Sequence, residues 1–160
     1  MYSLCLHYLQ HTQDAQDVTQ EVFVTVHQSL HQFQHQSALS TWIYRIAVNK
    51  CIDHLRSRKR KRRLGLLFSV FGSDDNTWDG APHFDHPGVL AEQKESMSRL
   101  FECINALPEN YKTVIILSKM MKKSQVEVAE IMGSTPKAVE SLLQRAKLAL
   151  QKKINQTEGN

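Results

Sequence analysis

Apolar side chains recur at steps of three and four residues along most of the chain, which is the spacing of one face of an α-helix. The first such pattern predicts a helix over residues 14–31, with Asp14 as its N-cap. Residues 33–40 lack the pattern and are expected to form a loop. A second helix is predicted from Ser40 or Thr41 to about Arg63. The expected inward positions are Ala15, Val18, Val22, Val26 and Leu30 in the first helix, and Trp42, Ile43, Ile46, Ala47, Cys51 or Ile52, and Leu55 in the second.

The second half of the chain shows the same spacing in residues 89–106, 108–121, 124–132 and 136–150. Ser124 and Glu127 have the spacing of a capping box, which opens a helix. A turn at residues 133–135 contains Gly133, and Pro136 suits the first turn of the helix that follows. A short helix, a turn with Gly and a second helix together form a helix-turn-helix pattern. The expected inward positions of the last helix are Val139, Leu142, Leu143, Ala146 and Leu150.

Residues 64–90 separate these two halves and show no sustained period. They hold four of the six Gly and two of the four Pro, a composition typical of a linker. The predicted fold is therefore all-α, with two small helical domains joined by a flexible acidic linker. The expected boundaries are 1–63 for the first domain, 64–93 for the linker and 94–160 for the helix-turn-helix domain.

The net charge of +4 conceals a segregation of charge along the chain. Residues 1–63 carry nine basic and four acidic side chains, residues 64–93 carry only five acidic ones, and residues 94–160 carry eleven basic and seven acidic ones. Two cationic modules favour a polyanionic partner such as nucleic acid or an acidic membrane face. No apolar stretch approaches the ~20 residues of a membrane span, so no membrane insertion is expected.

Three widely spaced cysteines, with no CxxC pair, argue against a disulfide framework or a zinc ribbon and favour a reducing, intracellular setting. His27, His31 and His35 lack acidic or thiol companions, so we expect no metal site. No nucleophile–base pair or phosphate-binding loop is present. The chain is therefore predicted to be a non-enzymatic protein without a cofactor, located in the cytoplasm.

The last predicted helix carries polar side chains on the face opposite Val139 and Leu143. The second helix of a helix-turn-helix offers such side chains to the major groove of DNA. Arg145 suits guanine, Gln144 suits adenine and Lys147 suits a phosphate. An ordinary helical hairpin with a solvated face remains the alternative. The candidate DNA-binding residues are Lys137, Ser141, Gln144, Arg145 and Lys147, and Glu140 shares their face.

The second predicted helix ends in a run from Arg56 to Arg63 with seven basic residues among eight, more than a helix C-terminus needs. This run favours phosphate contact. Trp42 and Tyr44 lie among Arg45, Lys50 and Arg56, and aromatic rings between cations suit stacking on unpaired bases. For Trp42, a place in the core is an equal alternative. Asp17, Gln20 and Glu21 share one face of the first helix, which is either a solvated polar face or a partner interface.

Two pairs of strings resemble bacterial sigma factors of the extracytoplasmic-function class. DAQDVTQEVF (14–23) and STWIYRIAVNKCIDHLRSRKR (40–60) resemble the polymerase-binding and promoter-melting domain. ALPENYKTVIILSKM (106–120) and SQVEVAEIMGSTPKAVESLLQRAKLAL (124–150) resemble the C-terminal promoter-binding domain. The string AVESLLQRAK is most similar to members from the Bacteroidetes group. Members of the class usually carry further residues before the position of Met1.

The resemblance implies roles for particular residues. Asp17, Gln20 and Glu21 match the face that grips the clamp helices of RNA polymerase. The loop at residues 33–40 and the helix after it match the element that opens the minus-ten region. Its candidate DNA contacts are Trp42, Tyr44, Arg45, Asn49 and Arg56, while Ser141, Gln144 and Arg145 match the readers of the minus-thirty-five element. The implied partners are core RNA polymerase, promoter DNA and an anti-sigma factor.

Relatives often carry basic residues where this chain has Glu140 and Leu142, so we expect either a weaker affinity for the minus-thirty-five element or a different sequence preference. Two other classes remain as alternatives. A stand-alone helix-turn-helix regulator would bind duplex DNA tightly without polymerase, as a dimer. A helical metal-dependent phosphohydrolase that uses His and Asp would need a convergent set of ligands, which the sequence lacks.

Overall fold

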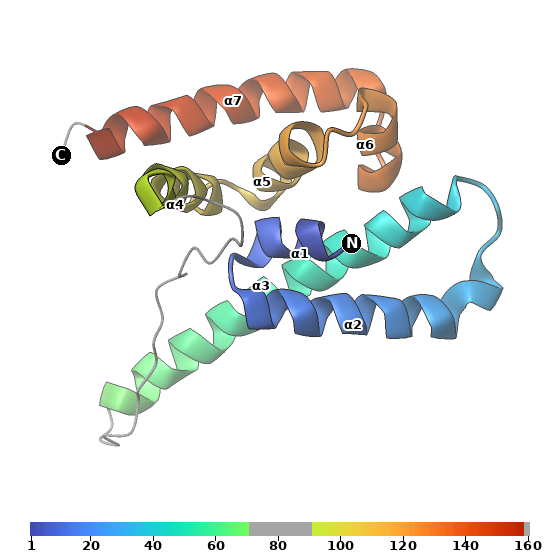
Figure 1. Cartoon of the computed structure of the whole chain (residues 1–160), viewed down its shortest axis with the longest axis horizontal. Coiled ribbons are helices and arrows are strands. Elements are labelled where there is room, and N and C mark those ends of the chain that lie inside the picture. The colour runs from blue at the N-terminus through green and yellow to red at the C-terminus, as the bar shows by residue number, and fades with distance from the viewer. Residues whose placement is uncertain (71–90, 159–160) are drawn as a thin grey trace.

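The computed structural model describes residues 1–70 and 91–158, and these residues form helices and short connections without any strand (Figure 1). The predicted all-α fold with two helical units is confirmed. No helix in the described residues is both long enough and apolar enough to cross a membrane. The N-terminal half holds α1 (Tyr2–Leu9), α2 (Thr12–Ser29), the 3-10 helix η1 (Leu30–Gln32) and α3 (Leu39–Val70). The C-terminal half holds α4 (Ala91–Asn105), α5 (Glu109–Ile115), the π-helix η2 (Ile116–Met120), α6 (Gln125–Met132) and α7 (Pro136–Glu158).

The N-terminal ends of α2 and α3 both lie earlier than the sequence pattern predicts. His11, not Asp14, caps α2, because the backbone of His11 is extended and its Nδ1 accepts a hydrogen bond from the Asp14 N–H at 3.3 Å. Helix α3 begins at Leu39, and the Trp42 N–H already donates to the carbonyl of Ala38 at 3.2 Å. Ser40 and Thr41 therefore belong to the first turn of α3 and do not cap it.

Helix α3 also continues past Arg63 to Val70, into the segment predicted as linker. A single glycine costs a helix only about 1 kcal/mol, so Gly65 among leucines does not end it. Helix α4 begins at Ala91, inside the predicted linker range of 64–93. The rest of that acidic linker, residues 71–90, lies outside the described residues.

One continuous hydrophobic core joins the two halves of the chain. Helix α1 lies between the α2–α3 pair and the C-terminal helices, and packs on both (Figure 1). Seven of the predicted inward positions are buried, the others are half-buried, and Leu30 is 50% exposed; the buried ones are Ala15, Val18, Val22, Ala47, Cys51, Val139 and Ala146. All three cysteines are free and buried, as expected for small apolar side chains. The fully buried members include Leu4, Tyr8, Val18, Val22 and Cys51 from the first half, and Phe101, Ile104, Val114, Leu117, Val128 and Val139 from the second.

The predicted helix-turn-helix is formed by α6 and α7. Ser124 Oγ accepts from the Glu127 N–H at 3.2 Å, and Glu127 Oε2 accepts from the Ser124 N–H at 2.9 Å, which completes the predicted capping box. Gly133 ends α6 with a φ of 63°, a left-handed conformation that favours glycine. Thr135 Oγ1 then accepts from the Ala138 N–H at 3.2 Å at the start of α7.

Candidate nucleic-acid and polymerase interfaces

The outer face of α7 presents all the predicted minus-thirty-five residues to solvent. Val139 and Ala146 are fully buried, and they fix the side of α7 that faces the core. The Arg145 Nε–H donates to the carbonyl of Ser141 at 3.3 Å, within the helix. The exposed residues on the opposite side are Lys137, Ser141, Gln144, Arg145 and Lys147, together with Glu140. Their geometry is that of a recognition helix with its polar side chains unobstructed.

Four of the five predicted minus-ten residues share one stripe of α3. Trp42, Arg45, Asn49 and Arg56 are spaced by three, four and seven residues, so they follow one another along the helix. Arg45, Asn49 and Arg56 are exposed, and Trp42 is half-buried. Tyr44 does not belong to this stripe. Its ring lies where the N-terminal half packs against the C-terminal half, a contact region called the seam below. There the Lys123 ammonium is 4.7 Å from the ring centroid.

Trp42 belongs to a small aromatic cluster at the end of the loop between α2 and α3. Its ring centroid lies 5.4 Å from that of Phe33, which in turn lies 4.6 Å from His35. Trp42 is half-buried: it packs on Phe33, and part of its side chain remains accessible, so the DNA-stacking role stays a prediction. Phe33 was missed as a candidate, although an aromatic residue in a predicted loop was a usable signal. The three rings give the loop an apolar surface beside the cationic stripe.

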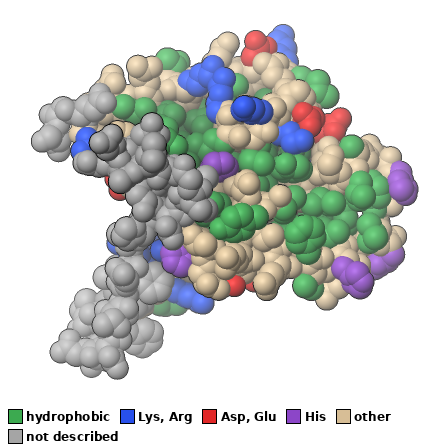
Figure 2. Space-filling view, viewed as in Figure 1, with side chains coloured by type: hydrophobic (Ala, Val, Ile, Leu, Met, Phe, Trp, Pro, Cys, Tyr) green, Lys and Arg blue, Asp and Glu red, His purple; other side chains and the backbone are tan. Residues whose placement is uncertain are grey.

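The predicted polymerase face on α2 is fully exposed. Asp17 accepts a hydrogen bond from Gln13 at 3.3 Å, and Glu21 lies 3.8 Å from the ammonium of Lys50 on α3. Phe23 and Val24, which the sequence analysis missed, are each 54% exposed on the same helix. Figure 2 shows hydrophobic side chains reaching the surface over α2 and the start of α3. Exposed apolar residues beside polar ones are typical of a protein-binding surface.

The basic residues between Arg56 and Arg63 of α3 have different surroundings. Arg58 Nη1 donates to Asp14 Oδ2 at 3.3 Å, and His54 Nε2 lies 3.5 Å from the same carboxylate, so this end of the run ties α3 to α2. Arg60, Lys61 and Arg63 are exposed. No group of three or more His, Cys, Asp or Glu side chains in residues 1–70 and 91–158 is arranged to hold a metal ion.

A pocket of about 410 Å³ opens between α3 and the C-terminal half. Among the described residues, its lining includes five basic side chains and one acidic side chain, Glu109. Arg56 forms a two-pronged ion pair with Glu109, with nitrogen–oxygen distances of 3.0 and 3.3 Å. The basic lining residues are Arg56, Arg58, Lys59, Arg62 and Lys112.

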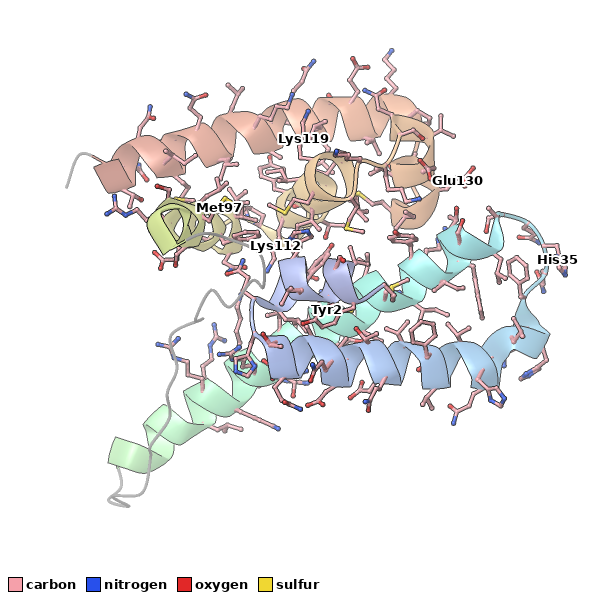
Figure 3. All side chains as sticks on the ribbon, viewed as in Figure 1. Tyr2, His35, Met97, Lys112, Lys119 and Glu130 are labelled. Atoms are coloured by element: carbon pink, nitrogen blue, oxygen red, sulfur yellow. The ribbon has the colours of Figure 1, made fainter. Side chains whose placement is uncertain are left out.

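Lys112 is 4% exposed at the floor of this seam (Figure 3). Its Nζ donates to the carbonyl of Tyr8 at 2.8 Å and to Oδ1 of Asn105, while Asn105 donates to Gln10 Oε1 at 2.8 Å. Burial lowers the pKa of Lys112 to about 8, and the neighbouring Lys59 acts in the same direction. Neither residue pattern nor charge singled out Lys112, yet it connects α5 to α1.

Comparison with known proteins relates both halves of the chain to one family. Residues 1–61 match Sigma-70 region 2, and residues 97–150 match Sigma-70, region 4. The ECF RNA polymerase sigma factor SigW of Bacillus subtilis is 32% identical over 158 residues, covering 96% of this chain and 82% of the relative. The chain belongs to the ECF sigma factors. The sigma-E factor of Escherichia coli K12 is 29% identical over 141 residues, covering 88% of this chain and 74% of that protein.

Two solved structures share this fold. The sigma factor RpoE of Bartonella quintana, in complex with the anti-sigma factor NepR, matches with a TM-score of 0.62 and 19% identity, covering 96% of this chain and 89% of that one. CnrH, in complex with the cytosolic domain of CnrY, matches with a TM-score of 0.64 and 21% identity, covering 96% and 80%. Like other ECF sigma factors, this protein binds core RNA polymerase and directs transcription to promoters, and it is not an enzyme.

Proposed function

We propose that the sigma factor divides its work among three surfaces, in domains bounded at 1–63 and 94–160 with the acidic linker of 64–93 between them. Asp17, Gln20 and Glu21 on α2 bind the polymerase clamp, and the exposed Phe23 and Val24 extend that contact. The observation that carries this assignment is that Asp17, Gln20 and Glu21 are all exposed on one face of α2.

The two cationic faces contact different promoter elements. Trp42, Tyr44, Arg45, Asn49 and Arg56 capture the minus-ten element, with the rings stacking on unpaired bases and the cations binding phosphates. The α7 residues Lys137, Ser141, Gln144, Arg145 and Lys147 read the minus-thirty-five element in the major groove. Extruding a base costs a few kcal/mol, and stacking against the Phe33–Trp42 cluster offsets part of that cost.

We also infer an anti-sigma partner, because one of the similar solved structures is a sigma factor in complex with an anti-sigma factor. The string AVESLLQRAK supports an origin in the Bacteroidetes group. The cytoplasm is the expected compartment, since core polymerase and promoter DNA are the partners.

Co-elution of the full chain with bacterial core RNA polymerase tests the α2 assignment. The wild-type protein should form a stoichiometric complex, and the double variant Gln20→Ala/Glu21→Ala should lose at least tenfold in affinity if these are interface hot spots. The double variant Glu102→Ala/Gln151→Ala removes the same two exposed side-chain types from the C-terminal half, and it should bind as the wild type does. Equal binding by both variants would refute the assignment. Failure of the wild type to bind, combined with tight duplex DNA binding, would instead favour a stand-alone regulator.

A further inference from the structure

The pocket between α3 and the C-terminal half combines cationic and apolar side chains in one lining. Arg56, Lys59 and Arg62 follow one another on α3 at steps of three residues, so they share one face of the helix. The volume of about 410 Å³ lies in the range that small-molecule sites commonly have. The apolar members of the lining come from α1, α3 and the turn between α4 and α5, and they are Leu9, Ile52, Leu55, Leu107 and Pro108.

The positive charge of this lining is only partly neutralised by neighbouring acids. Arg56 pairs with Glu109, and Arg58 pairs with a carboxylate of α2 that lies outside the lining. Within the part of the chain that the structure describes, Lys59 and Arg62 form no ion pair. Two cations of the pocket are therefore available to a bound anion.

Lys112 adds a further cation, which is buried. It is 4% exposed on α5, and its hydrogen-bond partners are neutral groups, the carbonyl of Tyr8 and the side chain of Asn105 (Figure 3). Burial of an ammonium group without a carboxylate partner is costly, and it lowers the pKa of Lys112 to about 8. An anionic group in the pocket would therefore stabilise the charged form of Lys112.

We propose that this pocket binds a nucleoside polyphosphate, with its phosphates among the basic side chains and its base and sugar against the apolar ones. Five basic side chains and one acidic side chain leave an excess of four positive charges in the described lining. A single phosphate group carries only about 1.5–2 negative charges at neutral pH, so this excess suits a chain of phosphates. Arginine binds phosphate oxygens with two parallel hydrogen bonds, and lysine binds them as a point charge. The site goes beyond the proposed promoter contacts and shares only Arg56 with them.

Titration calorimetry of the full chain with ATP tests the cationic part of the site. The titrations are made at physiological salt and without magnesium, so that the phosphates keep their full charge. The double variant Lys59→Ala/Arg62→Ala removes the two available cations and should bind ATP roughly tenfold more weakly than the wild type, or weaker still. Both side chains are exposed, so the variant should fold, which circular dichroism checks.

The matched control is Lys61→Ala/Arg63→Ala. It also removes one lysine and one arginine from exposed positions of α3, but neither residue belongs to the described lining of the pocket. The control should bind ATP as the wild type does. An equal loss of affinity in both double variants would show that ATP binds the basic run in general, and it would overturn the proposal. Absence of ATP binding by the wild type would overturn it as well.

Inorganic tripolyphosphate tests the apolar part of the site, because it has the same chain of phosphates without a base or sugar. Electrostatic attraction alone favours tripolyphosphate, which carries at least as much negative charge as ATP. Contact of the base and sugar with the apolar side chains should reverse this order, so that the wild type binds ATP roughly tenfold tighter. Equal or tighter binding of tripolyphosphate would overturn the assignment of the pocket to a nucleotide.

Glu109 gives a variant in which the affinity should rise. Its carboxylate competes with phosphate for Arg56, and Glu109→Gln removes that charge while keeping the size of the side chain. ATP should bind this variant roughly threefold tighter than the wild type, or tighter still. Glu102→Gln, at an exposed position of α4 outside the described lining, is the control and should bind as the wild type does. Equal affinity of the two variants would contradict a phosphate site beside Arg56.

Discussion

The two proposed DNA-binding faces, on α3 and α7, have similar chemistry but different surroundings. On α7, the five proposed minus-thirty-five residues are all exposed, and the helix lies at the outer edge of the C-terminal half (Figure 1). On α3, Arg56 and Tyr44 already have partners from the other half of the chain. The position of a helix in the fold therefore decides whether a cationic face is available to DNA.

Helix α3 is the more constrained of the two because it packs on both sides. Val48 and Cys51 are buried in the core, and Arg58 pairs with Asp14 on α2. The rest of the α3 surface is shared among α1, α6, Glu109 of α5 and solvent. Less of α3 is therefore accessible to DNA than of the outer face of α7.

The largest effect is expected from a substitution in the hydrophobic core that the two halves share. Phe101 on α4 is 1% exposed and stacks on His7 of α1, with ring centroids 5.9 Å apart. Phe101→Ala should lower the free energy of unfolding by about 3–5 kcal/mol and loosen the seam over α3. Urea denaturation measures the loss. Leu148→Ala, at a position 72% exposed on α7, is the control and should change stability by less than about 0.5 kcal/mol. A loss below about 1 kcal/mol for Phe101→Ala would contradict the shared-core description.

The next largest effect concerns the exposed face of α7. Arg145→Ala should cost about 1–3 kcal/mol of discrimination at one base pair of the minus-thirty-five element, while binding to polymerase is retained. Lys147→Ala should weaken binding uniformly across sequences and reduce the salt slope by about 1, because it removes a phosphate contact. In vitro transcription from a pool of promoters randomised at this element measures both. An unchanged base preference in Arg145→Ala would show that α7 does not read the element through this residue.

A smaller effect should follow from pH at the seam. The pKa of Lys112 is about 8 in the folded protein because of burial, against an ordinary value of 10.5 for an accessible lysine. The folded protein therefore loses this proton above pH 8 while the unfolded chain still holds it, so the free energy of unfolding should rise by up to about 1.4 kcal/mol per pH unit from pH 8 towards 10.5. Below pH 8, Lys112 contributes no pH dependence. Urea denaturation at a series of pH values measures this trend, and Lys112→Met should abolish it. A trend that persists in Lys112→Met would assign it to other groups.

The positions of most helices follow from the spacing of apolar residues, but the contacts between the two halves of the chain do not. The inward stripes of α2 and α7 and the Ser124–Glu127 capping box depend on neighbours three and four residues away, so the sequence predicts them. The Arg56–Glu109 ion pair joins residues 53 positions apart, and Lys112 reaches Tyr8 across 104 positions. Such contacts depend on how the two halves dock, which no helical period encodes.

Two features that the sequence analysis missed or misplaced, the buried Lys112 and the cap of α2, could nevertheless have been predicted from the sequence. Lys112 lies three and four residues before Ile115 and Ile116, which places a lysine on a buried face, and a buried lysine requires partners. His11 precedes the apolar stripe of α2 closely enough to cap it, but the preference for Asp at an N-cap favoured Asp14. The candidate residues on α7 were easier to place, because a solvated face needs only the stripe opposite to it.

The smallest predicted effect lies at the turn where the seam and the recognition unit meet. Ser124 caps α6, and its neighbour Lys123 covers Tyr44 while pairing with Glu127 at 2.6 Å. Ser124→Ala removes the capping acceptor and should lower the free energy of unfolding by about 1 kcal/mol, whereas Gln125→Ala at the next, exposed position should have little effect. Because α7 keeps its own cap at Thr135, the minus-thirty-five preference should be unchanged while the cover over Tyr44 weakens. Thermal unfolding measures the loss of stability, and in vitro transcription from promoters randomised at the minus-thirty-five element measures the preference. A shifted minus-thirty-five preference would mean that the two DNA faces are coupled through this turn.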